Sequence, residues 1–195
     1  MPTLLAACIV AELRSDSGYN GVTAIDKRPA AGRVKVHRLG LRADVQADRK
    51  HHGGLDQAVY AYSQVDAEFW QNELGRELPP GWFGENLRVD GLDATAARAG
   101  ERWRIGEAGV VLEATVPRTP CMTFARWVGG KEAPGWVKRF ADEGRLGAYF
   151  RVVHAGSVGA GDEITVTAAA PGAPTMLEIF RGTGTGTGTG TSAPL

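Results

Sequence analysis

Short apolar segments separated by glycine- and proline-containing turns are the feature that most limits the fold of this chain. Residues 34–39 alternate apolar and polar side chains, which indicates a half-buried strand. Further strands are expected at residues 3–13, 22–25, 57–62, 87–89, 101–105, 110–116, 149–154 and 163–166, and helices at 64–74, 123–128 and 136–142. The intervals between strands are too short for repeated βαβ crossovers. The sequence therefore predicts a strand-rich α+β domain, barrel-like, with a few peripheral helices.

The end of the chain differs in composition from the rest. From about residue 168 it becomes rich in alanine, glycine and proline, and residues 182–191 alternate glycine and threonine. Such a repeat cannot bury a core. A chain of 195 residues fits one domain with a tail, so we expect a domain over residues 1–170 and a flexible tail over 171–195. The apolar residues 176–180 could dock on this domain or on a partner.

Charge and cysteine content exclude several classes of protein. Lys+Arg and Asp+Glu both number 22, so the net charge is zero and no broad nucleic-acid footprint is expected. The two cysteines, Cys8 and Cys121, are too few for a disulfide scaffold, a zinc ribbon or an iron–sulfur cluster. Cys8 lies in a short apolar run and is expected in the core. No signal peptide or membrane helix is predicted, so we expect a cytoplasmic protein.

Cys121 is the strongest candidate for chemistry. It follows Pro117, Arg118, Thr119 and Pro120 at the end of an apolar strand, and the next segment can be helical. The prolines keep the backbone extended. A cysteine at a helix start, three residues after an arginine, has its thiolate favoured, and a thiolate is both a nucleophile and a soft metal ligand. The alternative is a small buried apolar residue.

Other polar residues have both a functional and a structural interpretation. His51 and His52, followed by Gly53 and Gly54, could ligate a metal or bind an anion, or form an ordinary loop. Asn86 could hydrogen-bond a heterocycle or cap a turn. Lys27 and Arg28 could bind phosphate or be a solvated pair. His52 could also serve Cys121 in a cysteine hydrolase. Walker, dinucleotide-binding and Gly-x-Ser-x-Gly motifs are absent from the sequence.

Five short stretches together resemble the MOSC domain family, named for the C-terminal domain of molybdenum cofactor sulfurases. They are TAIDK at 23–27, LGLRAD at 39–44, HGGLD at 52–56, FGEN at 83–86 and PRTPC at 117–121. They occur in the order and at the spacing of the family, and the resemblance covers residues 3–168. It is greatest to the small stand-alone bacterial members of the YiiM-like type.

The resemblance implies a MOSC fold, a bound molybdenum cofactor (molybdopterin) with Cys121 as the ligand to molybdenum, and no pyridoxal phosphate. Similar members reduce N-hydroxylated compounds, such as hydroxylaminopurines and amidoximes, to amines or amidines. From residue chemistry we assign Lys27, His52, Gly53 and Arg118 to the cofactor and Asn86 to pterin or substrate. Since the chain has no iron–sulfur ligands, electrons are expected from a separate protein such as a flavin reductase, and no membrane partner is expected. The alternative is a sulfur or cofactor carrier with a persulfide on Cys121.

Overall fold

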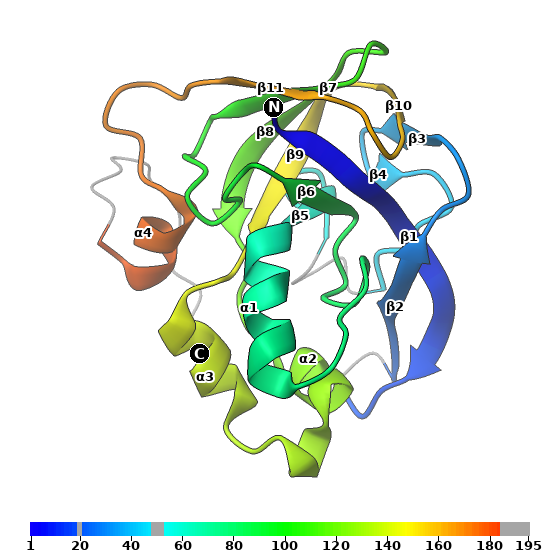
Figure 1. Ribbon diagram of the computed structural model, residues 1–195, viewed down its shortest axis with the longest axis vertical. Helices are drawn as coiled ribbons and strands as arrows, with labels where there is room; N and C mark the ends of the chain where they lie inside the picture. Colours follow the sequence, from blue (N-terminus) through cyan, green and yellow to red (C-terminus); the bar gives the residue numbers. More distant parts are fainter. Residues whose placement is uncertain (19–20, 48–52, 184–195) are drawn as a thin grey trace.

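The structure is a computed structural model that describes residues 1–18, 21–47 and 53–183 (Figure 1). The strands are β1 (Thr3–Ser15), β2 (Val22–Pro29), β3 (Val34–His37), β4 (Gly40–Leu41), β5 (Val59–Ser63), β6 (Leu87–Asp90), β7 (Arg102–Ile105), β8 (Val110–Pro117), β9 (Ala148–His154), β10 (Gly156–Val158) and β11 (Ile164–Thr167). The helices are α1 (Gln64–Leu74), α2 (Met122–Val128), α3 (Trp136–Glu143) and α4 (Met176–Arg181), with a 3-10 turn at Gly130–Glu132. The predicted strand-rich α+β class is confirmed.

Most strands belong to one sheet of eight, in the order β11-β7-β8-β9-β5-β6-β1-β2. Neighbours are antiparallel except β5 and β6, which are parallel. A parallel pair needs a crossover connection, and α1 supplies it between these two strands. A small sheet, β10-β3-β4, flanks the large one. The single crossover agrees with the expectation that βαβ units do not repeat.

The large sheet curls until the start of β1 contacts the start of β11 and the turn before it. The Leu4 amide donates to the Asp162 carbonyl over 2.9 Å, and the Ile164 amide donates to the Pro2 carbonyl over 2.9 Å. Thr3 and Glu163 form an isolated antiparallel bridge between them. This short contact does not make a full ladder, so the sheet is barrel-like without being closed.

Two buried clusters fill the molecule. The one inside the curled sheet is largely aliphatic, with Leu4, Val59, Leu87 and Leu112 almost inaccessible to solvent. The other is aromatic and lies where α1, α2 and α3 gather at one end of the sheet (Figure 1). Its fully buried rings include Trp70, Phe83, Phe124 and Phe140. The aromatic cluster supports the segments that carry Arg118 and Cys121.

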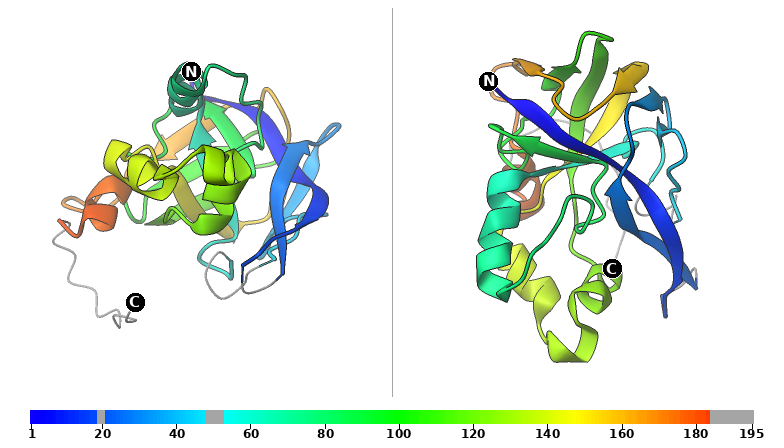
Figure 2. Two further views of the ribbon diagram at one scale, coloured as in Figure 1. Left: turned by 90° about the horizontal axis from the view of Figure 1, so that it is seen from below. Right: turned by 45° about the vertical axis from the view of Figure 1, so that its right-hand side comes forward.

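The hairpin of β1 and β2 extends beyond the curled sheet as a long curved arm, seen clearly in the right-hand view of Figure 2. Its register shifts between Val10 and Glu12 and again between Glu12 and Arg14. Such irregularities bend a strand pair and increase its twist. The arm therefore curves towards α2 and encloses the space between them.

Helix α4 corrects the prediction of a flexible tail over residues 171–195. Thr175 caps this helix by accepting from the Glu178 amide over 3.1 Å, and the Glu178 carboxylate accepts from the Thr175 amide over 2.7 Å. Met176 is fully buried, and its amide donates to the Ala97 carbonyl. The packed domain therefore reaches Arg181, and the apolar patch docks on the domain itself. Most of the Gly–Thr repeat lies outside the described residues.

Within residues 1–18, 21–47 and 53–183, none of the helices has both the length and the apolar character needed to cross a membrane.

Candidate functional site

A pocket of about 160 Å³ lies between the β1–β2 arm and the start of α2. The arm forms one wall, residues 44–47 and 57–60 form a second, and the turn around Gly84 and Asn86 forms the floor. Four residues predicted for the site, Lys27, Asn86, Arg118 and Cys121, line this pocket. Gly53 is half-buried and is not among the lining residues that the structure describes. His51 and His52 lie outside the described residues.

Cys121 occupies the cap position at the start of α2, as the sequence predicts. Its backbone is extended, with φ −136° and ψ 163°, and its side chain is partly exposed. Asp16 chiefly, and Cys121 to a smaller extent, raise the pKa of the Arg126 guanidinium. Because electrostatic interactions are mutual, the cation stabilises a thiolate at Cys121 in return. The thiol therefore lies in a pocket, at a helix start and beside positive charge.

Cys8 makes a useful contrast, because it is fully buried in the sheet. Burial raises the pKa of its thiol well above the ordinary value. It is absent from the lining of the pocket, so the expectation of a core cysteine is confirmed.

Arg118 is a buried cation held between two aromatic rings. Its guanidinium carbon lies 4.4 Å from the centre of the Phe124 ring and 5.0 Å from that of Tyr60. Its Nη1 donates to the Phe83 carbonyl and, over 3.4 Å, to the Tyr60 hydroxyl. Burial lowers the pKa of Arg118, but Tyr60, Tyr149 and Cys121 raise it by more, so it stays charged. A fixed cation therefore stands three residues before Cys121.

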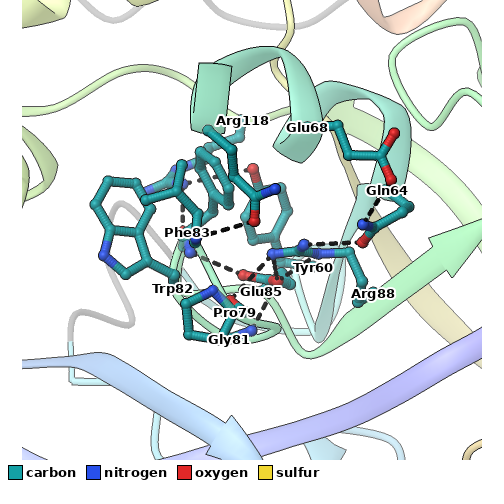
Figure 3. Close-up of polar contacts among 12 residues, drawn as sticks. Tyr60, Gln64, Glu68, Pro79, Gly81, Trp82, Phe83, Glu85, Arg88 and Arg118 are labelled. Atoms are coloured by element: carbon teal, nitrogen blue, oxygen red, sulfur yellow. Dashed lines mark hydrogen bonds and ion pairs between the residues drawn. The ribbon is translucent and has the colours of Figure 1, made fainter. Parts of the chain in front are cut away.

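The turn that receives Arg118 is itself fixed by a buried ion pair, shown in Figure 3. The Glu85 carboxylate accepts from the amides of Gly81 and Phe83 over 2.7 and 2.9 Å. It also lies 2.6 Å from Nη2 of Arg88, and the two side chains are almost inaccessible to solvent. Hence Glu85 determines where the Phe83 carbonyl lies, and that carbonyl positions Arg118.

Lys27 and Asn86 meet at Asp44 in the pocket wall. The Lys27 ammonium forms a close ion pair with Asp44, and both side chains are about nine-tenths buried. Asn86 Nδ2 donates to the same carboxylate over 2.7 Å and to the Cys8 carbonyl over 3.3 Å. Asn86 Oδ1 accepts from the Tyr60 amide over 3.1 Å. These bonds show that Asn86 cross-links strands and positions Asp44; contact with a ligand stays a prediction for both Asn86 and Lys27.

A second ion pair joins the arm to α2 at the edge of the pocket. Asp16 accepts two hydrogen bonds from Arg126, each of 2.6 Å, and one from the Thr123 hydroxyl of 3.0 Å. The Arg126 guanidinium holds the pKa of the Asp16 carboxyl below its ordinary value. This contact fixes the arm against the helix that begins beside Cys121.

Gln57 is a lining residue whose shielded amide oxygen has unused hydrogen-bonding capacity. Its side-chain Oε1 is shielded from solvent and has no hydrogen-bond partner within the described part of the chain. Buried polar atoms are normally paired, so an unpaired one beside a pocket favours ligand binding.

Sequence reasoning missed Asp16, Asp44, Gln57 and Glu85 as members of this site. Asp44 and Glu85 lie within the stretches LGLRAD and FGEN, and Gln57 directly follows HGGLD. The stretches themselves were therefore a signal for these three. Asp16 lies in a polar loop outside these stretches. Its place at the site is recognised only from its ion pair with Arg126.

The chemistry of the side chains in the pocket is suited to the molybdenum cofactor. The thiol of Cys121 is a soft ligand, Arg118 and Lys27 are cations suited to phosphate, and the unpaired Gln57 oxygen suits an N–H group. Across the described ranges, no group of three or more His, Cys, Asp or Glu side chains could hold a metal ion. If the molybdenum cofactor binds here, Cys121 would supply a thiolate ligand to the metal.

The sequence profile of the MOSC domain matches residues 48–165 of this chain. YflK of Bacillus subtilis (strain 168) is 40% identical over 139 residues, covering 71% of this chain and 61% of YflK. YiiM of Escherichia coli (strain K12) is 36% identical over 103 residues, covering 51% of this chain and 45% of YiiM. The chain therefore matches less than two thirds of the length of these relatives.

A solved structure of YiiM from Geobacillus stearothermophilus superposes with a TM-score of 0.72 at 24% identity, covering 93% of this chain and 83% of that one. At this identity the likeness shows the fold alone, and it agrees with the strand-rich domain described above. Since the profile matches more than half of the residues, the chain belongs to the MOSC domain family.

Proposed function

We propose that this protein binds the molybdenum cofactor through Cys121 and reduces N-hydroxylated compounds to amines or amidines. The observation that carries the proposal is the partly exposed thiol of Cys121 in a pocket that also contains Arg118 and Lys27. Membership of the family named for molybdenum cofactor sulfurases supports the cofactor. A relative from Gibberella moniliformis, 29% identical over 150 residues, carries the name reductase, which supports redox chemistry.

Each residue has a distinct part in holding the cofactor. Cys121 would ligate the metal as a thiolate, which its place at a helix start beside Arg126 favours. Arg118 would face an anionic group of the cofactor as a cation that cannot be deprotonated. The Lys27 charge is already balanced by Asp44, so Lys27 would add hydrogen bonds more than net charge. The predicted roles of His52 and Gly53 rest on residue chemistry alone, because His52 lies outside the described residues and Gly53 is not among the described lining residues.

When bound, the cofactor would supply two-electron redox chemistry for removal of the hydroxyl oxygen, and Cys121 would hold it in the pocket. The overall reaction is R–NH–OH + 2e⁻ + 2H⁺ → R–NH₂ + H₂O, in which the N–O bond breaks and the hydroxyl leaves as water. The pocket residues would orient the N–OH group and limit water around it. Because the chain has only two cysteines, it cannot hold an iron–sulfur cluster by itself, and we assign electron supply to a separate flavin reductase.

The test is the molybdenum and pterin content of protein expressed in a host that makes the cofactor. We compare the wild type with Cys121→Ala and with Cys8→Ala, which removes a thiol that does not line the pocket. The wild type and the Cys8 variant should carry close to one molybdenum per chain, and the Cys121 variant should carry almost none. Turnover of benzamidoxime with a flavin reductase should follow the same order.

The opposite results are equally informative. Well-folded wild type without molybdenum would overturn the proposed mechanism. A persulfide on Cys121, detected by mass spectrometry in protein that shows no turnover, would instead establish a sulfur carrier. Equal loss of metal in both cysteine variants would show that Cys121 has no special role.

A further inference from the structure

Gln57 is a half-buried residue whose amide oxygen is shielded from solvent and unpaired beside the pocket. In the described part of the chain, four buried side-chain atoms lack a hydrogen-bond partner, on Gln57, Asp66, Trp70 and Trp136. Gln57 alone of these four lines the pocket that contains Cys121. The other three belong to the region of the helices and are not lining residues.

The backbone around Gln57 is held firmly. The Thr115 hydroxyl donates to the Asp56 carbonyl, and Gln46 Nε2 donates to the Gln57 carbonyl over 3.4 Å. The Gly54 amide donates to Gln46 Oε1 over 2.9 Å. Side chains carried by such fixed backbone keep a defined position in a site.

The neighbouring donors in the pocket are directed elsewhere. Lys27 and Asn86 both donate to Asp44. A buried amide oxygen without a donor is unfavourable, so an incoming N–H group gains by pairing with it. The pocket thus offers an acceptor to a ligand that carries a donor.

We propose that Gln57 is a specificity-determining residue whose Oε1 accepts a hydrogen bond from an N–H of the N-hydroxylated substrate. This inference rests on the proposed function and deepens it. The preferred substrates then carry an N–H group on the carbon that bears the reacting nitrogen, as amidoximes do. N-hydroxylated compounds whose neighbouring nitrogen is fully substituted bind less well. The pterin also has N–H groups, and the experiment separates this second source.

The experiment compares wild type, Gln57→Leu and Gln57→Glu. Leucine has a similar size and no acceptor, whereas glutamate keeps the acceptor and loses the donor. KM and kcat are measured for benzamidoxime and for N,N-dimethylbenzamidoxime, which lacks the amino N–H. Gln57→Leu should raise KM for benzamidoxime about tenfold, the effect of one hydrogen bond, and leave the dimethyl compound almost unchanged. Gln57→Glu should bind benzamidoxime much as the wild type does.

Two further readouts make every outcome decisive. If Gln57→Leu loses molybdenum while the wild type is loaded, the oxygen serves the cofactor and the substrate proposal is overturned. Calorimetric titration with benzamidoxime tests recognition even if the wild type holds no metal. Binding by the wild type that weakens about tenfold in Gln57→Leu supports the proposal whatever happens to the proposed function. Equal binding by the two proteins, or no binding to the wild type, overturns it.

Discussion

The turn around Glu85 and the pocket wall around Asp44 both contain polar side chains that are almost inaccessible to solvent. They use their hydrogen-bonding atoms differently. In the turn, Glu85 accepts from two backbone amides and from Arg88, while Arg88 also donates to Gln64 and to the Pro79 carbonyl (Figure 3). In the wall, the Lys27–Asp44 pair adjoins a cavity and an amide oxygen without a partner.

The difference separates polar groups that are fully paired within the fold from polar groups that adjoin the pocket. A fully paired buried network makes a segment rigid, whereas a partly paired one lowers stability until something binds. The Glu85 turn therefore serves the site from outside, by holding the carbonyl that positions Arg118. The wall around Asp44 lines the pocket directly.

The largest expected effect is from Glu85→Gln. It leaves the Arg88 cation buried without its counter-ion, and breaking such a pair costs about 3–5 kcal/mol of unfolding free energy. Urea denaturation at pH 7 measures the change. Glu113→Gln is the control, because Glu113 pairs with the half-exposed Arg102. Its effect should stay below about 1 kcal/mol. Similar losses in both variants would contradict the distinction between the two regions.

Asp44→Asn should have a smaller effect on stability. It removes the charge that balances Lys27, but the neighbouring cavity lets water or ligand reach the ammonium. We expect a loss of about 2 kcal/mol, close to the value of a charged hydrogen bond. The same denaturation experiment measures it. A loss as large as that of Glu85→Gln would show that the wall is as closed as the turn.

Asp16 should give the arm an acid-sensitive contact with α2. The Arg126 guanidinium lowers the pKa of Asp16 in the folded protein, so the carboxylate stabilises the fold above its unfolded pKa of about 3.9. That stabilisation is lost as the pH falls through the folded pKa. Asp16→Asn should therefore lower the unfolding free energy by up to about 1 kcal/mol at pH 7. The difference from wild type should shrink between pH 5 and pH 2.5, and a constant difference would contradict this account.

The smallest expected effect on stability is from Gln57→Leu. Replacing an unpaired buried oxygen by an apolar group removes a penalty, so the unfolding free energy should change by less than about 0.5 kcal/mol or rise slightly. Thermal unfolding of the ligand-free protein measures this. A loss above about 1 kcal/mol would show that the amide supports the fold. Gln57 would then have a structural role, as Glu85 has.

Much of this arrangement could be predicted from the sequence. The prolines before Cys121 and the helix after it predicted a thiol at a helix start, and the structure confirms that geometry. The strand pattern predicted the fold class, because alternation and short spacing are local properties. Helix α4 was missed although Thr175 and Glu178 have the spacing of a capping box. Its docking depends on Met176 filling a distant part of the core, which composition does not reveal.

The partners of Asp44 and Asp16 could not be predicted, since they are far apart in sequence. Asp44 reaches Lys27 across 17 residues, and Asp16 reaches Arg126 across 110. The unpaired state of Gln57 can be recognised only once every neighbour has been placed. Local sequence identified which residues could do chemistry, and the fold decided which of them are already paired.

The meeting of β1 with the far end of the chain has a consequence for synthesis. Strand β1 finds β2 within a few residues, but its other partners are Leu87 in β6 and the bridge at Glu163. On the ribosome, the first strand emerges long before these partners exist. Its unpaired edge is then a hazard for association with other nascent chains, since exposed strand edges template pairing. The contact between β1 and the segment around Glu163 can therefore form only after residue 163 has been synthesised.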